Sequence, residues 1–203
     1  MTLKSDELDV LNEIINIGIG DAAAILNEMI NSHVELTAPI VEVTSQAQLQ
    51  ERLSSEIGNH LSVVEMGFNG SFSGKSNLVF PYDSAVKLVE MLTGRSEKDS
   101  DFETISSGTI NEIGNIILNS VMASFSNMVA ESLDYDVPVF HDLELPDFLK
   151  DDVAKDGNII WGQVNFQASE IKLHGQIILV FEIGTLKKSI QKVQSAAGVL
   201  KPQ

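Results

Sequence analysis

The stretch Asn12–Ile17 (NEIINI) returns almost unchanged as Asn111–Ile116 (NEIGNI), 99 positions later in the chain. A proline lies 23 residues after the second Asn of each copy, at Pro39 and at Pro138. Further along, SGKSNLVF (73–80) is matched by HGQIILVF (174–181) at an offset of 101. Three landmarks in the same order predict an internal duplication. We therefore expect one domain over 1–203, made of two repeats at about 6–94 and 103–195.

The first repeat is predicted to begin with a long helix and to continue with a β-hairpin. Residues 5–31 carry apolar side chains at helical spacing. Gly18 and Gly20 are expected to kink or divide this helix, since each lowers helix stability by roughly 1 kcal/mol relative to Ala. Apolar runs on both sides of Asn69 and Gly70, a pair suited to a two-residue turn, predict the hairpin.

The remaining elements follow from cap and turn signals. After Pro81 ends the hairpin, Asp83 is predicted to cap a short helix that closes at Gly94. The second repeat should have the same order, behind a charged linker. Its predicted parts are the linker Arg95–Thr104, a long helix Glu103–Ala130, strands Asn158–Phe166 and Ile171–Phe181, and a closing helix Leu186–Val193. The fold class is therefore α/β (α+β), with long helices packed on antiparallel strands around a pseudo-two-fold axis.

Composition excludes several classes of function. The chain has no cysteine, which rules out disulfides, thiolate metal sites and cysteine nucleophiles. Its net charge of −16 argues against binding nucleic acid or anionic membranes, because both require basic surface. No apolar run is long enough to span a membrane, and acidic residues occupy the start where a signal peptide would be apolar. A cytoplasmic protein that binds a folded partner or a small molecule is expected.

Several stretches resemble nucleotide-binding, nucleophile or metal-binding motifs, but their sequence context favours a structural role. GIGDAA (18–23) resembles a dinucleotide fingerprint but follows a helical pattern instead of a strand. GSFSGKS (70–76) is one residue short of a phosphate-binding loop and lies in the predicted hairpin. Ser106 and Ser107 lack the sequence context of a nucleophile. The four histidines have no ligand spacing, so no metal site is predicted; they are His33, His60, His141 and His174.

The repeated letters place polar side chains on one helical face. At about 100° per residue, Asp9, Glu13 and Asn16 form a stripe about 60° wide. Glu112 and Asn115 repeat the last two positions of that stripe in the second copy. A single Glu and Asn on a helix would be ordinary solvated surface. The same pair at the same spacing in both copies indicates a functional face.

This pattern resembles the signature of the CheC-type phosphatases of bacterial chemotaxis, whose wider family includes CheX and the phosphatase part of FliY. The signature is Asp or Ser, then Glu, Asn and a distant Pro. The first copy is complete. The second has Gly108 where Asp or Ser is expected, while Ile15 replaces a glycine that the second copy keeps as Gly114. Two copies resemble CheC or FliY more than single-site CheX, and the absence of an appended flagellar-switch domain favours CheC.

The resemblance implies a substrate and a role for each residue. The substrate would be a CheY-like response regulator phosphorylated on aspartate, which supplies its own Mg²⁺ and a lysine, so no cofactor of this chain is expected. Asn16 and Asn115 would orient the attacking water. Glu13 and Glu112 would pair with the regulator's lysine. Asp9, Pro39 and Pro138 would support the sites.

Other readings stay open. The chain could be a non-catalytic scaffold of the flagellar switch, or a module that binds phosphorylated regulator or the deamidase CheD without much hydrolysis. If it is a phosphatase, both sites are expected to work, with the first at least as active because its stripe is complete. Ile15 is expected to pack inward. Gly114 is expected to leave space for the regulator beside Asn115.

Overall fold

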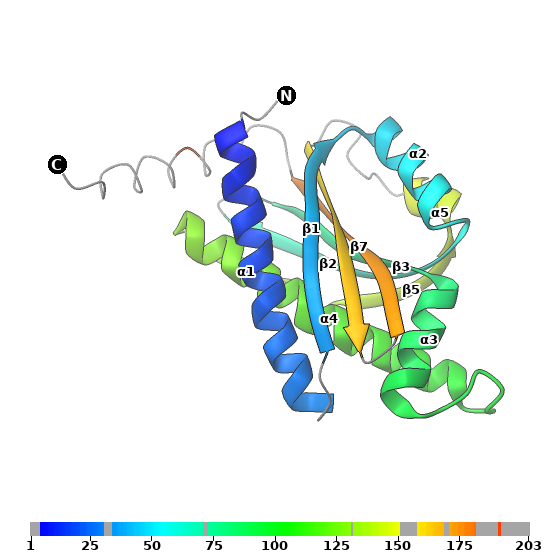
Figure 1. The fold of residues 1–203 in the computed structure, drawn as a ribbon. Helices are drawn as coiled ribbons and strands as arrows, with labels where there is room; N and C mark the ends of the chain where they lie inside the picture. Colours follow the sequence, from blue (N-terminus) through cyan, green and yellow to red (C-terminus); the bar gives the residue numbers. More distant parts are fainter. Residues whose placement is uncertain are drawn as a thin grey trace.

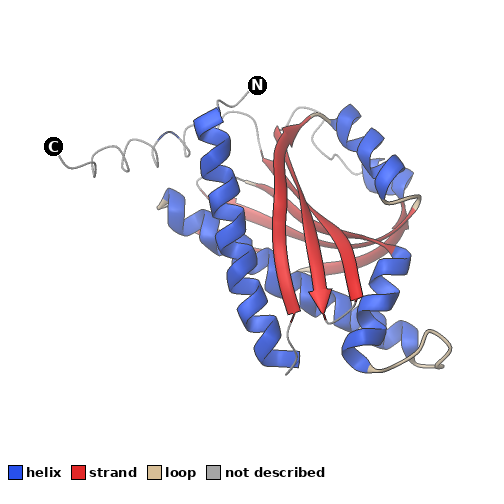
Figure 2. Ribbon diagram, viewed as in Figure 1, coloured by secondary structure: helices blue, strands red, loops and turns tan. Residues whose placement is uncertain are grey.

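The computed structural model describes residues 5–30, 34–70, 73–130, 132–150, 158–168, 171–181 and 191. The described part of the chain contains both helices and strands, and Figures 1 and 2 show the helices packed against a curled sheet. The elements are α1 (Ser5–Ile30), β1 (Val34–Thr44), α2 (Gln46–Glu56), β2 (His60–Gly70), β3 (Gly74–Pro81), α3 (Tyr82–Thr93), α4 (Phe102–Val129), β4 (Leu133–Tyr135), β5 (Val139–Glu144), α5 (Leu145–Lys150), β6 (Asn158–Ala168) and β7 (Ile171–Phe181).

The strands form one antiparallel sheet in the order β1-β6-β7-β3-β2-β4, and β5 also pairs with β2. Residues of α1, α3 and α4 form one hydrophobic cluster with one face of the sheet. Residues of α2 and α5 form a second cluster with the other face. The predicted fold class, with long helices packed on antiparallel strands, is confirmed.

The middle of the sheet relates the two halves of the sequence. Asn77 of β3 lies opposite Ile178 of β7, and these two residues are also partners in the alignment of the repeated letters. The outer strands cross over between halves: β1 pairs with β6, while β4 and β5 pair with β2. This pairing is the one that the expected pseudo-two-fold axis would produce if it passed between β3 and β7. The predicted closing helix (186–193) lies outside the described residues except for Gln191.

Burial on both faces explains the apolar runs in the central strands. In β7, Ile177 belongs to the cluster under α1 and α4, whereas its neighbour Ile178 belongs to the cluster under α2 and α5. Successive side chains of a strand point to opposite faces, so a strand covered on both sides needs consecutive apolar residues. The strand predicted over Ile171–Phe181 is confirmed, and Ile177, Ile178 and Leu179 within it are buried.

The two spaced prolines lie at matching irregularities of the outer strands. Pro39 falls in β1, an edge strand, where the register with β6 shifts between Thr37 and Ile40. Pro138 falls in the break between β4 and β5, which both pair with β2. Proline has no N–H to donate, so a sheet accepts it at an edge or a bulge. The prolines thus explain where each outer strand is interrupted.

Two local predictions were wrong. Asn69 and Gly70 do not form the hairpin turn; β2 runs through both, and they pair with Asp134 and Leu133 of β4. Asp83 does not cap α3: the helix begins at Tyr82 after Pro81, without a side-chain cap. The other end was predicted correctly, since Gly94 closes α3 in the left-handed conformation with φ of 67° and donates its N–H to the carbonyl of Glu90.

Helix α1 is not divided at its glycines, contrary to the prediction; it is one helix from Ser5 to Ile30. Helices α1 and α4 cross in Figure 1, and Gly18 of α1 is buried against the backbone of α4. A Cβ atom at Gly18 would lie 2.4 Å from Cα of Val121 and 2.9 Å from the carbonyl oxygen of Ser120. Gly20, in contrast, is exposed and has no atom within 4 Å of such a Cβ. Gly18 therefore lets two helix backbones touch.

Replacing these two glycines by Ala should have opposite effects on stability. Gly18→Ala should lower the free energy of unfolding by about 1–3 kcal/mol, because the new methyl group meets the backbone of α4 and cannot be accommodated by a rotamer change. Gly20→Ala should raise it by about 1 kcal/mol through helix propensity alone. Urea denaturation of both variants measures the effects, and a Gly18→Ala variant as stable as the parent would contradict the close crossing.

Candidate active site on two crossing helices

The first predicted site lies on the outer face of α1. Asp9, Glu13 and Asn16 are all exposed, as the helical spacing requires. The side-chain nitrogen of Asn16 donates to the backbone carbonyl of Asn12 at 2.8 Å. Within the described part of the chain, no group donates to Oδ1 of Asn16. This site therefore presents two carboxylates and an amide oxygen that is free to accept a hydrogen bond.

The second predicted site lies on α4 and differs in one contact. Glu112 is exposed and Asn115 is half-buried. The side-chain nitrogen of Asn119 donates to the backbone carbonyl of Asn115 at 2.8 Å and to its Oδ1 at 2.5 Å. Sequence analysis missed Asn119, although its place one helical turn after Asn115 was the signal that could have identified it.

The first Asn of each hexamer has a different environment from the second. Asn12 is half-buried and donates to the carbonyl of Leu8 at 3.1 Å. Oδ1 of Asn111 is buried, and no described residue donates a hydrogen bond to it. A buried amide is stable only while its polar atoms find partners. These two residues thus lie at the inner border of the polar stripe, beside buried isoleucines such as Ile15 and Ile110.

Neither helix offers a positive charge near these carboxylates. There is no Lys or Arg anywhere in α1 or α4. Among the described residues, neither Glu13 nor Glu112 takes part in an ion pair. Both carboxylates are therefore available to a cation that a partner supplies.

A cavity of about 440 Å³ opens beside the second site. Gly108, which stands where the signature has Asp or Ser, lines it and would have no atom within 4 Å of an added Cβ. Glu112 lies on the same wall. The other walls come from the ends of α1 and α3 and from α4, through Leu26, Met29, Leu92, Thr93, Thr109 and Ile113. The missing side chain at Gly108 thus leaves a largely apolar hollow next to Glu112.

Gly114 does not leave space for a partner, contrary to the prediction. It is buried, and a Cβ added to it would lie 2.5 Å from Cβ of Val64 in β2. The equivalent residue of the first copy, Ile15, is fully buried, which agrees with the expectation that it packs inward. Both positions face the core. Gly114 allows α4 to lie so close to β2 that no side chain fits between them, whereas α1 has room for the side chain of Ile15.

Adding a methyl group at this contact should destabilise the protein, and removing the facing side chain should compensate. Gly114→Ala should lower the free energy of unfolding by about 1–3 kcal/mol through overpacking. Combining it with Val64→Ala should recover part of that loss, because the two groups share one space. A double-mutant cycle by urea denaturation measures the coupling. Gly108→Ala, which meets no atom, is the control and should not lower stability.

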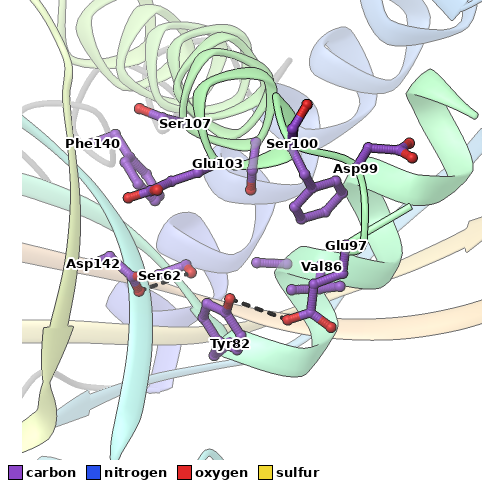
Figure 3. Close-up of a pocket in the computed structure, with 13 residues that line it drawn as sticks. Ser62, Tyr82, Val86, Glu97, Asp99, Ser100, Glu103, Ser107, Phe140 and Asp142 are labelled. Atoms are coloured by element: carbon purple, nitrogen blue, oxygen red, sulfur yellow. Dashed lines mark hydrogen bonds between the residues drawn. The ribbon is translucent and has the colours of Figure 1, made fainter. Parts of the chain in front are cut away.

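A larger cavity of about 530 Å³ lies beside the start of α4 (Figure 3). Ser106 and Ser107, dismissed above as nucleophiles, are on its wall. Two hydrogen bonds cross this region: Tyr82 donates to Glu97 at 3.4 Å, and Ser62 donates to Asp142 at 3.5 Å. None of the predicted site residues lines this cavity.

The charge of this second cavity is strongly negative. Its walls include Glu97, Asp99, Glu103 and Asp142, and no Lys or Arg. Burial raises the pKa of the Tyr82 hydroxyl, and the negative charges of Glu97 and Asp142 raise it further. The phenol therefore stays protonated at neutral pH and acts as a hydrogen-bond donor. The cavity is an acidic hollow without an evident nucleophile.

Two of the described histidines, His60 and His174, have structural partners. His60 stacks on Tyr82 with ring centroids 4.4 Å apart and lies 3.1 Å from Asp142. His174 hydrogen-bonds to Asn165 at 2.7 Å. In the described ranges, no group of three or more His, Cys, Asp or Glu side chains could hold a metal ion. Nor is any described helix both long enough and apolar enough to cross a membrane.

Known sequences that match the chain come from bacterial chemotaxis. The family model "Chemotaxis phosphatase CheX" matches residues 62–154. The CheY-P phosphatase CheC of Bacillus subtilis is 22% identical over 139 residues, covering 67% of this chain and 66% of that protein. The flagellar motor switch phosphatase FliY of the same organism is 25% identical over 138 residues, covering 67% of this chain but 35% of that protein.

Solved structures share the fold over most of the chain. Thermotoga maritima FliY superposes with a TM-score of 0.75 at 18% identity, covering 96% of this chain and 99% of that one. FliM from Helicobacter pylori, in its complex with SpeE, gives 0.68 at 14% identity over 98% and 100%. A chain of the CheX–CheY–BeF3–Mg complex of Borrelia burgdorferi gives 0.55 at 16% identity over 84% and 99%.

The two-copy motif, the family model and the curated relatives point the same way, and the fold agrees with them. The chain is therefore similar in sequence and in fold to proteins of the CheC/CheX/FliY family.

Proposed function

We propose that this protein hydrolyses the aspartyl phosphate of a CheY-like response regulator. One observation carries the proposal: an exposed Glu and an Asn three residues later occur at matching positions of two helices that cross on one face of the sheet. The names of the relatives support it, since CheC of B. subtilis is a CheY-P phosphatase. The complex of CheX with CheY from B. burgdorferi supports a regulator as the partner.

The glutamates are proposed to dock the regulator. Glu13 and Glu112 are exposed, and neither helix supplies a cation to either of them. A lysine from the regulator's active site would meet a carboxylate that no Lys or Arg of its own helix occupies. The charge-assisted hydrogen bond between them would fix the position of the helix on the regulator. The net charge of −16 would also steer a partner whose approaching surface carries positive charge.

The asparagines are proposed to position the water. An amide oxygen can accept a hydrogen bond from water while the amide nitrogen faces a phosphoryl oxygen. The water oxygen attacks phosphorus, the bond from phosphorus to the aspartyl oxygen breaks, and inorganic phosphate leaves with the regulator's carboxylate restored. Because an amide does not take a proton, the rate gain comes from orientation. Mg²⁺ and the lysine on the regulator would offset charge on the phosphoryl oxygens.

A non-catalytic scaffold is the main alternative, since FliM shares this fold. At such low identity the fold alone does not separate an enzyme from a scaffold. The feature that favours catalysis is the Glu–Asn pair, which is present twice. Both glutamates are exposed and have no ion-pair partner among the described residues, and no described group donates to Oδ1 of Asn16. A scaffold has no need for two such pairs at one spacing.

Phosphate release should depend on the regulator's metal. With a CheY-like regulator phosphorylated on aspartate, addition of this protein should accelerate release of inorganic phosphate in the presence of Mg²⁺. Chelating Mg²⁺ should remove the acceleration, because the chain contributes no metal of its own to the proposed reaction. Binding of the phosphorylated regulator without acceleration, across several regulators, would favour the binding-module alternative.

Removing the water-orienting amides should reduce turnover in steps. Asn16→Ala and Asn115→Ala should each lower turnover only partly, because the other site remains. The double variant should reduce kcat by about 10²-fold or more, the scale of other positioning groups, while binding of phosphorylated regulator persists. Asn127→Ala removes an exposed amide elsewhere on α4 and is the matched control. Full activity in the double variant would end this mechanism.

Neutralising the docking carboxylates should weaken binding of the regulator more than it lowers kcat. Glu13→Gln with Glu112→Gln should raise KM for the regulator and make the remaining activity less sensitive to salt, because the charge pair is lost. Glu51→Gln, on α2 at the opposite face of the sheet, is the control. An unchanged KM in the double variant would remove the docking role.

The resemblance also predicts a CheD-type deamidase as a second partner. We propose this partner on the resemblance alone. Titration of labelled CheD with this protein, with and without phosphorylated regulator, tests whether the two partners bind independently.

A further inference from the structure

We propose that Asn119 is a positioning residue of the second site: it holds the side-chain amide of Asn115 in one orientation. This inference rests on the proposed function of Asn115 for its effect on turnover. Asn119 lies outside the repeated hexamer and outside the four-residue signature, so neither motif assigns it a role.

The geometry is a double contact from one nitrogen. The side-chain nitrogen of Asn119 carries two hydrogens, and it lies 2.8 Å from the backbone carbonyl oxygen of Asn115 and 2.5 Å from its Oδ1. Both residues are half-buried on α4. The contact to the backbone fixes Asn119 against its own helix. The contact to Oδ1 then fixes the amide of Asn115 against Asn119.

The first site lacks this support. The position equivalent to Asn119 in the first repeat is Gly20, which is exposed and has no atom within 4 Å of an added Cβ. Asn16 instead donates through its nitrogen to the carbonyl of Asn12. The two amides are therefore held from opposite ends: the nitrogen of Asn16 is tied to the helix, whereas the oxygen of Asn115 is tied to Asn119.

This difference decides which hydrogen-bonding groups each site presents. A carbonyl oxygen has two lone pairs, so Oδ1 of Asn115 keeps one for a water after accepting from Asn119. Both N–H groups of Asn115 stay available for phosphoryl oxygens, whereas one of those of Asn16 is already used. An amide held before the regulator arrives has less rotamer freedom to lose on docking. Asn119 thus supports a site whose stripe is incomplete at Gly108.

Swapping the two residues between the sites tests the role in turnover. In an Asn16→Ala background, where only the second site remains, Asn119→Gly should lower kcat about fivefold with KM for the regulator unchanged. In an Asn115→Ala background, Gly20→Asn should give the first site a new amide one turn after Asn16 and raise its kcat. Asn127→Gly on α4 removes an exposed amide and adds the same helix penalty, so it is the matched control and should leave kcat unchanged.

A second readout does not depend on turnover. Three-bond NMR couplings from the side-chain carbonyl carbon report the χ1 rotamer of each Asn in the free protein. Asn115 should show a single rotamer in the parent and averaged couplings in Asn119→Gly. In the Asn127→Gly control, the couplings of Asn115 should stay as in the parent.

The outcomes separate this inference from the proposed function. Unchanged Asn115 couplings in Asn119→Gly, or a rise in kcat of the second site, would overturn the positioning role. A fall in kcat equal to that of Asn127→Gly would reduce Asn119 to a structural helix residue. If neither single-site background shows turnover but the couplings respond as expected, the positioning of Asn115 stands and the proposed function fails.

Discussion

The direct contact between the backbones of α1 and α4 is the constraint on which the rest of the molecule depends. A glycine at position 18 allows the axis of α1 to approach Val121 so closely that no side chain fits between the helices. At that distance both helices lie on the same face of the sheet and cover it together. The inner faces of both helices are buried in the core. The outer faces, which carry Glu13 and Glu112, remain exposed to solvent.

A shared fold does not decide function among the proteins that resemble this chain. FliY, CheX and FliM chains superpose on this one at identities of 18% or less. Two of them were solved in complexes with different proteins, CheX with CheY and FliM with SpeE. What they share with this chain is the fold. Chemistry depends on a few exposed side chains whose replacement would barely change the backbone. The Glu–Asn pairs therefore carry more information about activity than the superposition does.

The sequence was informative where one physical signal dominated. Helical periodicity placed α1 and α4 to within a residue or two, and the apolar runs predicted β6 and β7, with β6 ending two residues later than expected. Residues 34–56 were left unassigned, although the Ser45 and Gln48 capping box marks the start of α2. The hairpin turn was misplaced because β4, a distant segment, extends β2 through Gly70. The roles of Gly18 and Gly114 depend on contacts between elements that are distant in the sequence, which residue spacing does not reveal. The role of Asn119 depends on a side-chain contact within its own helix, which the repeated motif did not include.

The crossed pairing of outer strands has a consequence for how the chain folds. Each half contributes a strand that completes the other half's hairpin, β1 on β6 and β5 on β2. A half-length chain would leave those edges unpaired and its helix without the neighbour that covers it. Two identical half-length chains would satisfy the same pairing as a symmetric dimer. The native sheet therefore requires pairing between segments that are about a hundred residues apart in the chain.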